Sequence, residues 1–344
     1  LEQMIGTVGG ERLRNARIAV IGTSGTGSPV VHLLLREGVR ELVVVDFDHF
    51  EPSNLERIHG SEWQHLQSKP LKVELMRRMA AAINPKCRVT AIVGNILDEE
   101  VLDELLRCDL VFGCTDTFHS RVMLGDLAAH YLVPSIDMGV SVDGEKGAVK
   151  AQFMELTLNA PQWPCAHCDG RISVPQLAVE LMPDEEKESR RIEARKAEEQ
   201  GLDGGAYWNG ERPHILTVGY LTTNIASQAV GFAVGWLTGT FAPPHSRYQM
   251  NLNSPLLGVV DVPRKRRDSC SCGKCMGFAD QALADRSVSR PAHWPEPRWL
   301  TDSAEEERPT SNLRSPRSIK ALFQSIRMNW RVRRSKAHPA STKA

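Results

Sequence analysis

The chain has 344 residues and a formal net charge of zero, because 42 lysine and arginine residues balance 42 aspartate and glutamate residues. This length suits one large α/β domain with appendages. The neutral balance excludes global charge as an argument for nucleic acid or a membrane surface as a partner. The N-terminus, which begins on Leu1, shows no secretory signal, and we expect a cytoplasmic protein.

The first informative region extends to residue 48. Arg17–Ser28 predicts a buried strand that turns through glycines into a helix, and Leu42–Asp48 predicts a second buried strand with an acidic end. This order is typical of a nucleotide-binding βαβ unit, and Asp46 is placed where an acidic side chain can hold ribose hydroxyls. Small residues in the turn let backbone N–H groups face a phosphate. These residues are Gly22, Gly25 and Gly27. A NAD site would share the glycine pattern.

Strand and helix patterns alternate as far as residue 150. The strand-like runs are Ile18–Ile21, Leu42–Val45, Val89–Ile92, Leu110–Phe112 and Ser135–Met138. The helical patterns are Ser28–Glu37, Lys72–Ile83, Asp98–Leu106 and Phe118–His130. We expect a Rossmann-like, mostly parallel sheet with helices on both faces. Further strands, expected as an antiparallel extension, fall at Val149–Thr157, Tyr248–Asn251 and Gly258–Asp261.

Polar motifs follow the second strand in an order that a dehydrogenase does not need. They are Ser53-Asn-Leu-Glu-Arg57, Lys69-Pro-Leu-Lys-Val-Glu74 and Cys114-Thr-Asp-Thr-Phe-His-Ser-Arg121. Together with the glycine turn and the acidic strand end, they resemble the E1-like adenylating family, which includes ThiF, MoeB, HesA and the ubiquitin-activating enzymes. The resemblance runs from about Ile5 to about Gly277.

The resemblance implies ATP-dependent adenylation, in which a carboxylate attacks the α-phosphate and expels pyrophosphate. Two anions must meet, so the site needs positive charge and Mg²⁺. By resemblance, Asp46 binds the ribose, while the catalytic residues bind the phosphates and Mg²⁺. These catalytic residues are Arg57, Lys72 and Asp116.

Three further polar residues near this site each have two interpretations. Asp48 binds the nucleotide with Asp46 or caps the following turn. Asn54 bonds a phosphate oxygen or fixes its own loop, and Arg121 contacts substrate or forms a salt bridge on its helix. A NAD-dependent oxidoreductase would not need the segments that contain Asn54, Arg57 and Lys72.

Four of the eight cysteines form two Cys-x-x-Cys pairs. Two chelating pairs suit a closed, tetrahedral, structural zinc site, which would tie the end of the domain to its middle. The predicted ligands are Cys165, Cys168, Cys272 and Cys275. Cys270 is a spare thiol that could compete with Cys272, and a pair of redox dithiols is the alternative.

The stretch between residues 169 and 269 contains no cysteine. By resemblance, E1 enzymes that form a thioester usually carry the acceptor there, so we expect adenylation without a conventional internal thioester. The activated carboxylate would then pass to a sulfur donor or to the cysteine of a partner such as an E2-like protein. Cys270 is a reserve acceptor, and the other cysteines are expected near strands in the core. These are Cys87, Cys108 and Cys114.

One family motif is absent. Relatives of the MoeB type carry an N-terminal arginine that reaches the partner subunit's ATP, and neither Arg12 nor Arg14 matches its motif. The family usually dimerises, and we expect a homodimer. The apolar segment Ile215–Thr240 is expected as a buried interface helix, because its polar residues disfavour a membrane span.

We predict an adenylation domain over residues 1–285, with a mobile crossover region at about 171–214 that clamps the substrate tail. This region includes a densely charged helix, Asp184–Gln200. A Pro-, Ser- and Arg-rich extension, 286–344, carries an amphipathic helix at about 317–334. That segment could pack on the domain as a helix, remain a disordered tail, or bind a protein, a lipid surface or nucleic acid.

The leading hypothesis is adenylation of the C-terminal carboxylate of a ubiquitin-like or sulfur-carrier protein, in a bacterial conjugation-type system or in cofactor synthesis. A non-catalytic half of a heterodimer is the first alternative, which the missing arginine favours. Adenylation of a tRNA or a small molecule is the second, and the basic helix could serve RNA binding.

Overall fold

The computed structural model of the chain describes residues 1–145, 147–206, 217–254, 260–261, 265–281 and 288–300. The chain divides into two compact units, of which Leu1–Thr301 is the first. The second, Asp302–Ala344, contains the predicted amphipathic helix at 317–334 and lies outside the described residues.

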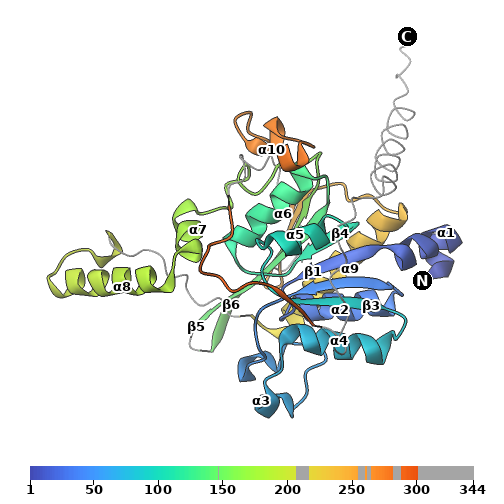
Figure 1. Cartoon of the computed structure of the whole chain (residues 1–344), viewed down its shortest axis with the longest axis horizontal. Helices are drawn as coiled ribbons and strands as arrows, with labels where there is room; N and C mark the ends of the chain where they lie inside the picture. The colour runs from blue at the N-terminus through green and yellow to red at the C-terminus, as the bar shows by residue number, and fades with distance from the viewer. Residues whose placement is uncertain (146, 207–216, 255–259, 262–264, 282–287, 301–344) are drawn as a thin grey trace, which may run out of the picture. The chain divides into compact units, whose positions relative to one another are not determined.

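The first unit is built on one sheet, whose nine strands in the described residues follow the order β8-β7-β6-β5-β4-β1-β2-β3-β9 (Figure 1). The central strands run parallel to one another. They are β1 (Arg17–Ile21), β2 (Glu41–Val45), β3 (Arg88–Val93), β4 (Leu110–Gly113) and β5 (Ser135–Glu145). Antiparallel strands flank them. These are β6 (Ala148–Asn159), β7 (Arg247–Asn251) and β8 (Val260–Asp261) beside β5, and β9 (Arg298–Leu300) beside β3. The predicted parallel sheet with an antiparallel extension is confirmed.

Helices cover both faces of the parallel strands, which explains why these strands are continuous apolar runs. In β1, Ile18 and Val20 face one core, and Ala19 and Ile21 face the other. The first core is covered by α1 (Glu2–Asn15), α2 (Gly27–Arg36), α4 (Lys72–Ile83) and α9 (Gly219–Thr238). The second is covered by α5 (Glu99–Leu105) and α6 (Phe118–His130).

Helix α9 lies in the apolar segment that we predicted as a buried interface helix, and its place at an interface stays a prediction. It packs against α1, α2, β5 and β6, and its residues Ile225, Ala229 and Ala233 have no exposed surface. None of the described helices combines the length and the apolarity that crossing a membrane requires.

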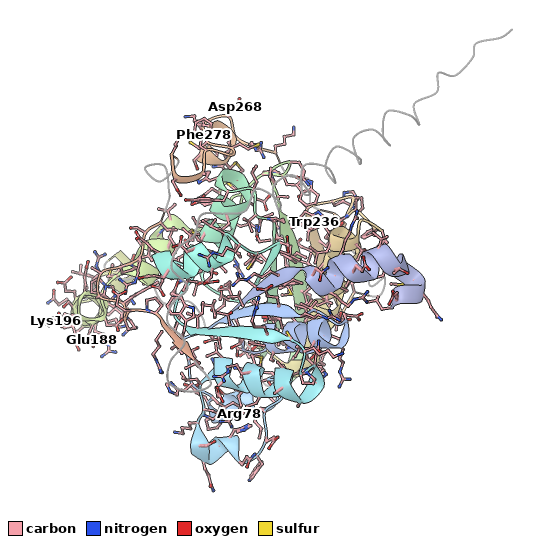
Figure 2. All side chains as sticks on the ribbon, turned by 45° about the vertical axis from the view of Figure 1, so that its right-hand side comes forward. Arg78, Glu188, Lys196, Trp236, Asp268 and Phe278 are labelled. Carbon is pink, nitrogen blue, oxygen red and sulfur yellow. The ribbon has the colours of Figure 1, made fainter. Side chains whose placement is uncertain are left out.

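Two helices follow the first cysteine pair. Helix α7 (Val174–Leu181) packs on α6, and its Leu177 joins the second core. Helix α8 (Asp184–Glu199) contacts the short helix η2 (Gly204–Ala206) and presents charged side chains such as Glu188 and Lys196 at its outer edge (Figure 2). The charged helix predicted at Asp184–Gln200 is therefore present.

Some elements depart from the sequence prediction. Strand β9 comes from the segment that we assigned to the C-terminal extension, so the sheet uses residues beyond the predicted boundary at 285. Helix α1 was not predicted, and it is kinked at Gly6, whose φ is 73°. Three short helices complete the described part: η1 (Pro52–Asn54), α3 (His65–Ser68) and α10 (Ser271–Lys274).

Candidate active site

The candidate site lies at the carboxyl ends of β1, β2 and β4. The strand order reverses at β1, because β2 and β3 lie on one side of it and β4 and β5 on the other. Open α/β sheets bind ligands at such a switch point. The glycine turn, Asp46 and Asp116 follow these three strands, so the chain brings them to one edge of the sheet.

Close backbone contacts fix the glycine turn between β1 and α2. Gly22 has a φ of +84°, and a Cβ on it would lie 2.8 Å from the carbonyl oxygen of Cys114. A Cβ on Gly27 would lie 1.9 Å from the carbonyl oxygen of Gly22. The N–H of Gly22 donates to the Val45 carbonyl, and that of Cys114 to the Ile21 carbonyl, both at 2.8 Å. These bonds tie the turn to β2 and β4.

Asp46, at the end of β2, is buried and holds the turn. Its Oδ2 accepts hydrogen bonds from the backbone N–H of Thr23 at 2.7 Å and from the Thr23 hydroxyl at 3.1 Å. Its Oδ1 accepts the N–H of Asp48 at 2.9 Å. Burial raises the pKa of Asp46, while Lys72 and the two N–H donors oppose that rise. The carboxylate is thereby held in one orientation at the site edge.

Lys72 opens α4, and its Nζ lies 2.8 Å from Oδ2 of Asp48. The Lys72 side chain is 8% exposed and that of Asp48 is 51% exposed, so a mostly buried ammonium is paired with a partly exposed acid. The N–H of Lys72 also donates to the Asp48 carbonyl at 3.0 Å. Asp48 therefore positions a candidate phosphate-binding cation.

The segment after β2 presents Arg57. Its Nη1 donates to the Ser53 carbonyl at 2.9 Å, and a Cβ on Gly25 would lie 3.0 Å from its Cδ. The stem of Arg57 therefore passes directly against the glycine turn. Asn54 is buried and its Oδ1 accepts the N–H of Glu51 at 3.1 Å. In this structure Asn54 fixes its own loop.

Asp116 is exposed, just before α6, and the start of that helix has a partner that the sequence did not reveal. Glu180 of α7 accepts the backbone N–H groups of Phe118 at 2.9 Å and His119 at 3.0 Å. Its Oε2 also lies 3.0 Å from Nδ1 of His119. This carboxylate caps α6 from the crossover region, and a side chain that acts across 61 residues leaves no local pattern in the sequence.

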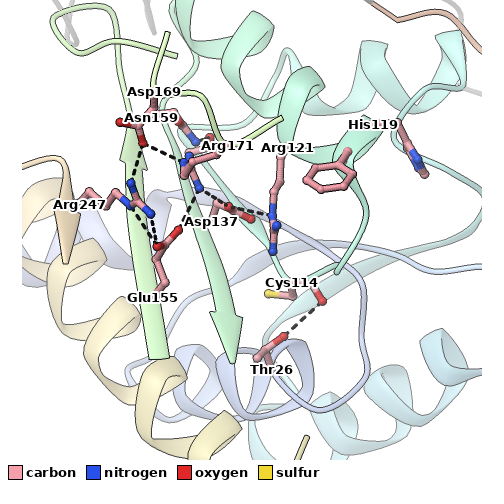
Figure 3. Close-up of polar contacts among 12 residues, drawn as sticks. Thr26, Cys114, His119, Arg121, Asp137, Glu155, Asn159, Asp169, Arg171 and Arg247 are labelled. Carbon is pink, nitrogen blue, oxygen red and sulfur yellow. Dashed lines mark hydrogen bonds and ion pairs between the residues drawn. The ribbon is translucent and has the colours of Figure 1, made fainter. Parts of the chain in front are cut away.

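A charged network lies beside the site, between α6 and the antiparallel strands (Figure 3). Its members are Arg121, Asp137, Glu155, Asp169, Arg171 and Arg247. Arg121 pairs with buried Asp137 at 3.4 Å, which is the salt-bridge interpretation of that residue. Burial opposes the ionisation of Glu155, but Arg171 and Arg247 outweigh it and lower its pKa. The three acids of the network balance its three arginines, so the network as a whole carries no net charge.

The structure brings four thiols together at the two cysteine pairs, and three of them are predicted zinc ligands. The Sγ atoms of Cys165, Cys168, Cys270 and Cys272 all lie within 4.8 Å of one another. Cys270 is the fourth member of this cluster, and Cys275 as a ligand stays a prediction. The extended backbone of Cys270 at the start of α10 carries it to 3.5 Å from Cys165, whereas Cys275 follows the end of α10.

The chemistry of this thiol cluster fits the predicted ion. Four sulfurs so close to one another suit tetrahedral coordination, and zinc prefers such soft ligands. The backbone N–H of Arg267 donates to Sγ of Cys168 at 3.3 Å, a contact that stabilises a thiolate. Of the remaining cysteines, Cys108, Cys114 and Cys275 are buried and Cys87 is partly buried.

Solved structures share this fold. The structure of E. coli MccB with ATP aligns with a TM-score of 0.56 at 16% identity, over 77% of this chain and 68% of that one. MccB in complex with N-formylated MccA gives a TM-score of 0.58 at 17% identity, over 78% and 70%. Likeness at this identity establishes the architecture alone.

Curated relatives and a family model match the sequence of this chain. A sulfur carrier protein adenylyltransferase of Thermus thermophilus is 32% identical over 165 residues, 48% of this chain and 59% of that protein. The sulfur carrier protein ThiS adenylyltransferase of Bacillus subtilis is 26% identical over 164 residues, 48% of this chain and 46% of that protein. The matched segments thus span less than two thirds of either relative. The model of the ThiF family matches residues 1–274, and the chain belongs to that family.

Proposed function

We propose that this protein is an ATP-dependent adenylyltransferase that activates the C-terminal carboxylate of a ubiquitin-like or sulfur-carrier protein. The observation that carries the proposal is the gathering of the glycine turn, Asp46 and the Asp116 segment at one sheet edge, with Arg57 against the turn. The names of the relatives, which are adenylyltransferases of sulfur carriers, agree with it.

In the proposed reaction, a carboxylate oxygen of the substrate bonds to the α-phosphorus of ATP. The bond from that phosphorus to the bridging oxygen breaks, and pyrophosphate leaves with the electron pair. The task of the chain is to position both anions and to neutralise charge. Arg57 and Lys72 supply the cations, Asp46 orients the ribose, and the turn offers its N–H groups to phosphate.

Asp116 is the proposed ligand of Mg²⁺, since an exposed carboxylate beside the nucleotide edge has the oxygen donors that this ion prefers. Mg²⁺ would add positive charge at the phosphates. We also propose structural zinc at the thiol cluster, where it would join the segment after β6 to α10.

The substrate tail would pass beneath the crossover region, whose described part, 171–206, contacts α6 through Glu180 next to Asp116. Since the sequence has no cysteine between residues 169 and 269, we propose transfer to a sulfur donor or to the thiol of an E2-like partner. We further propose a homodimer that acts in the cytoplasm, where thiols stay reduced.

The test is ATP–pyrophosphate exchange with Mg²⁺ and a panel of small carrier proteins. We expect exchange that depends on one carrier and is abolished by Asp116→Ala, with an unchanged circular dichroism spectrum. Asp103→Ala, which removes an exposed carboxylate from α5, is the matched control and should retain exchange.

Retained exchange in Asp116→Ala would remove that residue from the mechanism. ATP binding without exchange for any carrier would contradict the proposal and favour the non-catalytic half of a heterodimer. Exchange driven by a tRNA or by a small carboxylic acid would redirect the substrate assignment.

A further inference from the structure

A chain of side-chain hydrogen bonds passes through His59, two residues after Arg57. It joins α2, the segment after β2 and α9. Nε of Arg36 lies 2.6 Å from Nε2 of His32, both on α2. Nδ1 of His32 lies 3.0 Å from Nδ1 of His59, which follows Arg57 by two residues. Nε2 of His59 lies 3.0 Å from the hydroxyl of Thr223 on α9. We call Arg36, His32, His59 and Thr223 the histidine relay.

Donor and acceptor chemistry gives the relay one direction. A guanidinium N–H can only donate, so Nε2 of His32 accepts and its ring proton sits on Nδ1. That Nδ1–H then donates to Nδ1 of His59, whose own proton must be on Nε2, facing Thr223. The relay is therefore complete only when both rings are neutral, because an added proton would set two N–H groups against each other.

The relay is tied to the glycine turn through the backbone N–H of His59 and the hydroxyl of Ser28. The N–H of His59 donates to the Ser28 hydroxyl at 2.9 Å, and that hydroxyl donates to the carbonyl of Ser24 in the glycine turn at 2.8 Å. On the other side, a Cβ on Gly219 would lie 2.5 Å from the Glu56 carbonyl oxygen. The segment Glu56–His59 is thus held between the start of α9 and α2.

The electrostatic surroundings disfavour charge on either ring. Burial lowers the pKa of His32, with Arg36 adding to the effect, and burial lowers the pKa of His59. Among charged groups, Arg36 of α2 acts on His32, and Glu56 and Arg57 line the same cavity as His59. Helix α9 has no charged residue and offers hydroxyl and amide groups instead. Arg57, His59 and Thr223 line one cavity of about 580 Å³.

We propose that the histidine relay is a positioning device that holds Arg57 against the glycine turn and releases it on protonation. His59 is the positioning residue, and it acts on ATP only through Arg57. This inference rests on the proposed function, in which Arg57 binds the phosphates of ATP. His59 lies outside the family motifs that the sequence showed, so nothing in those motifs assigns it a role.

The sign of the pH effect follows from proton linkage. Because both folded-state pKa values lie below the ordinary histidine pKa of about 6.5, the unfolded chain binds more protons as the pH falls past that value. The contribution of the relay to stability is therefore complete above about pH 6.5 and is lost progressively below it. Arg57 should lose its position over the same range.

The first experiment reads the relay itself, independently of activity. Long-range ¹⁵N–¹H spectra of the ¹⁵N-histidine-labelled protein at about pH 7.5 report which ring nitrogen carries the proton. We expect Nδ1–H for His32 and Nε2–H for His59, assigned with His32→Asn and His59→Asn. A charged ring, or the opposite tautomer at either residue, would overturn the proposal.

The second experiment measures coupling to Arg57 by a double-mutant cycle on ATP–pyrophosphate exchange. His59→Ala should lower kcat/KM for ATP by about 10- to 100-fold, the order expected for a displaced substrate-positioning group. In an Arg57→Ala background the same change should have less than about a twofold effect. Equal effects in both backgrounds would show that His59 does not act through Arg57.

A matched pair tests the end of the relay. Thr223→Ser keeps the hydroxyl and should resemble the wild type, whereas Thr223→Val keeps the shape and should behave like His59→Ala. As the pH falls below about 6.5, the kcat/KM of the wild type should fall more steeply than that of His59→Ala. His245→Gln, outside the relay, should keep the wild-type profile. The same dependence of kcat/KM on pH in the wild type and in His59→Ala would contradict the release of Arg57 on protonation.

The two proposals fail in different ways. If the wild type shows no exchange with any carrier, the proposed function fails, while the tautomer spectra still decide whether the relay exists. If the wild type shows exchange but the effects of His59→Ala and Arg57→Ala add, the adenylation activity stands and the positioning role of His59 is wrong.

Discussion

Gly27 shows at the scale of one residue why the glycine turn requires glycine at this position. The Cβ of an alanine would meet the Gly22 carbonyl oxygen at 1.9 Å, and that oxygen belongs to backbone that cannot move aside cheaply. We predict that Gly27→Ala widens the turn, lowers the melting temperature and weakens ATP binding by tenfold or more, on the order of 1.4 kcal/mol. Calorimetry of ATP binding and thermal unfolding check both effects.

Gly231→Ala is the matched control for that change. Gly231 lies within α9, and a Cβ there meets nothing within 4 Å. Alanine in an exposed helix interior is favoured over glycine by roughly 1 kcal/mol, so this variant should gain stability and keep ATP affinity. Equal losses in the two variants would show that the turn is not specially constrained.

Residues in short motifs were predictable, and residues that act across the chain were not. Asp46, Lys72 and Asp116 follow a strand or open a helix, so their places at the sheet edge could be read from the sequence. Glu180 and the histidine relay depend on contacts between segments far apart, which no spacing encodes.

The thiol cluster is the clearest case at the scale of an element. The Cys-x-x-Cys spacing favoured Cys275, but the extended residue before the short helix α10 turns Cys270 toward Cys165. We predict that Cys270→Ser loses most of the bound zinc and unfolds at lower temperature, since structural zinc contributes on the order of 10 kcal/mol to folding. Metal analysis and the melting temperature measure this.

Cys275→Ser separates the two ligand sets. It should keep stoichiometric zinc and, after exchange with cobalt, the absorption spectrum of tetrahedral thiolate coordination. Loss of zinc from Cys275→Ser with retention in Cys270→Ser would support the sequence prediction and reject the cluster seen here.

Element prediction succeeded where burial imposes a strong pattern. The parallel strands are apolar on both faces and so stand out as runs, and α6 was predicted with the bounds that it has. Helix α1 was missed because Gly6, Gly9 and Gly10 weaken its helical signal. Strand β9 has only three residues, and its pairing with β3 depends on the tertiary fold.

At the scale of the whole molecule, the account rests on one arrangement. Three neighbouring strands end at one edge, where the glycine turn, Asp46 and the Asp116 segment meet cations supplied by the two segments after β2. Strands β6, β7 and β8 and the charged network lie on the β5 side, where α7 also brings Glu180 to α6. Such an edge suits a reaction that joins a nucleotide to a protein tail.

The most direct test of the central claim uses the carrier protein that supports ATP–pyrophosphate exchange. It compares two forms of that carrier, one with a free C-terminal carboxylate and one with a C-terminal amide. ATP–pyrophosphate exchange is measured for both, and intact mass spectrometry looks for an AMP adduct on the carrier. The account predicts exchange and the adduct with the free carboxylate alone. Exchange that persists with the amidated carrier would contradict it, because the attacking carboxylate would then lie elsewhere.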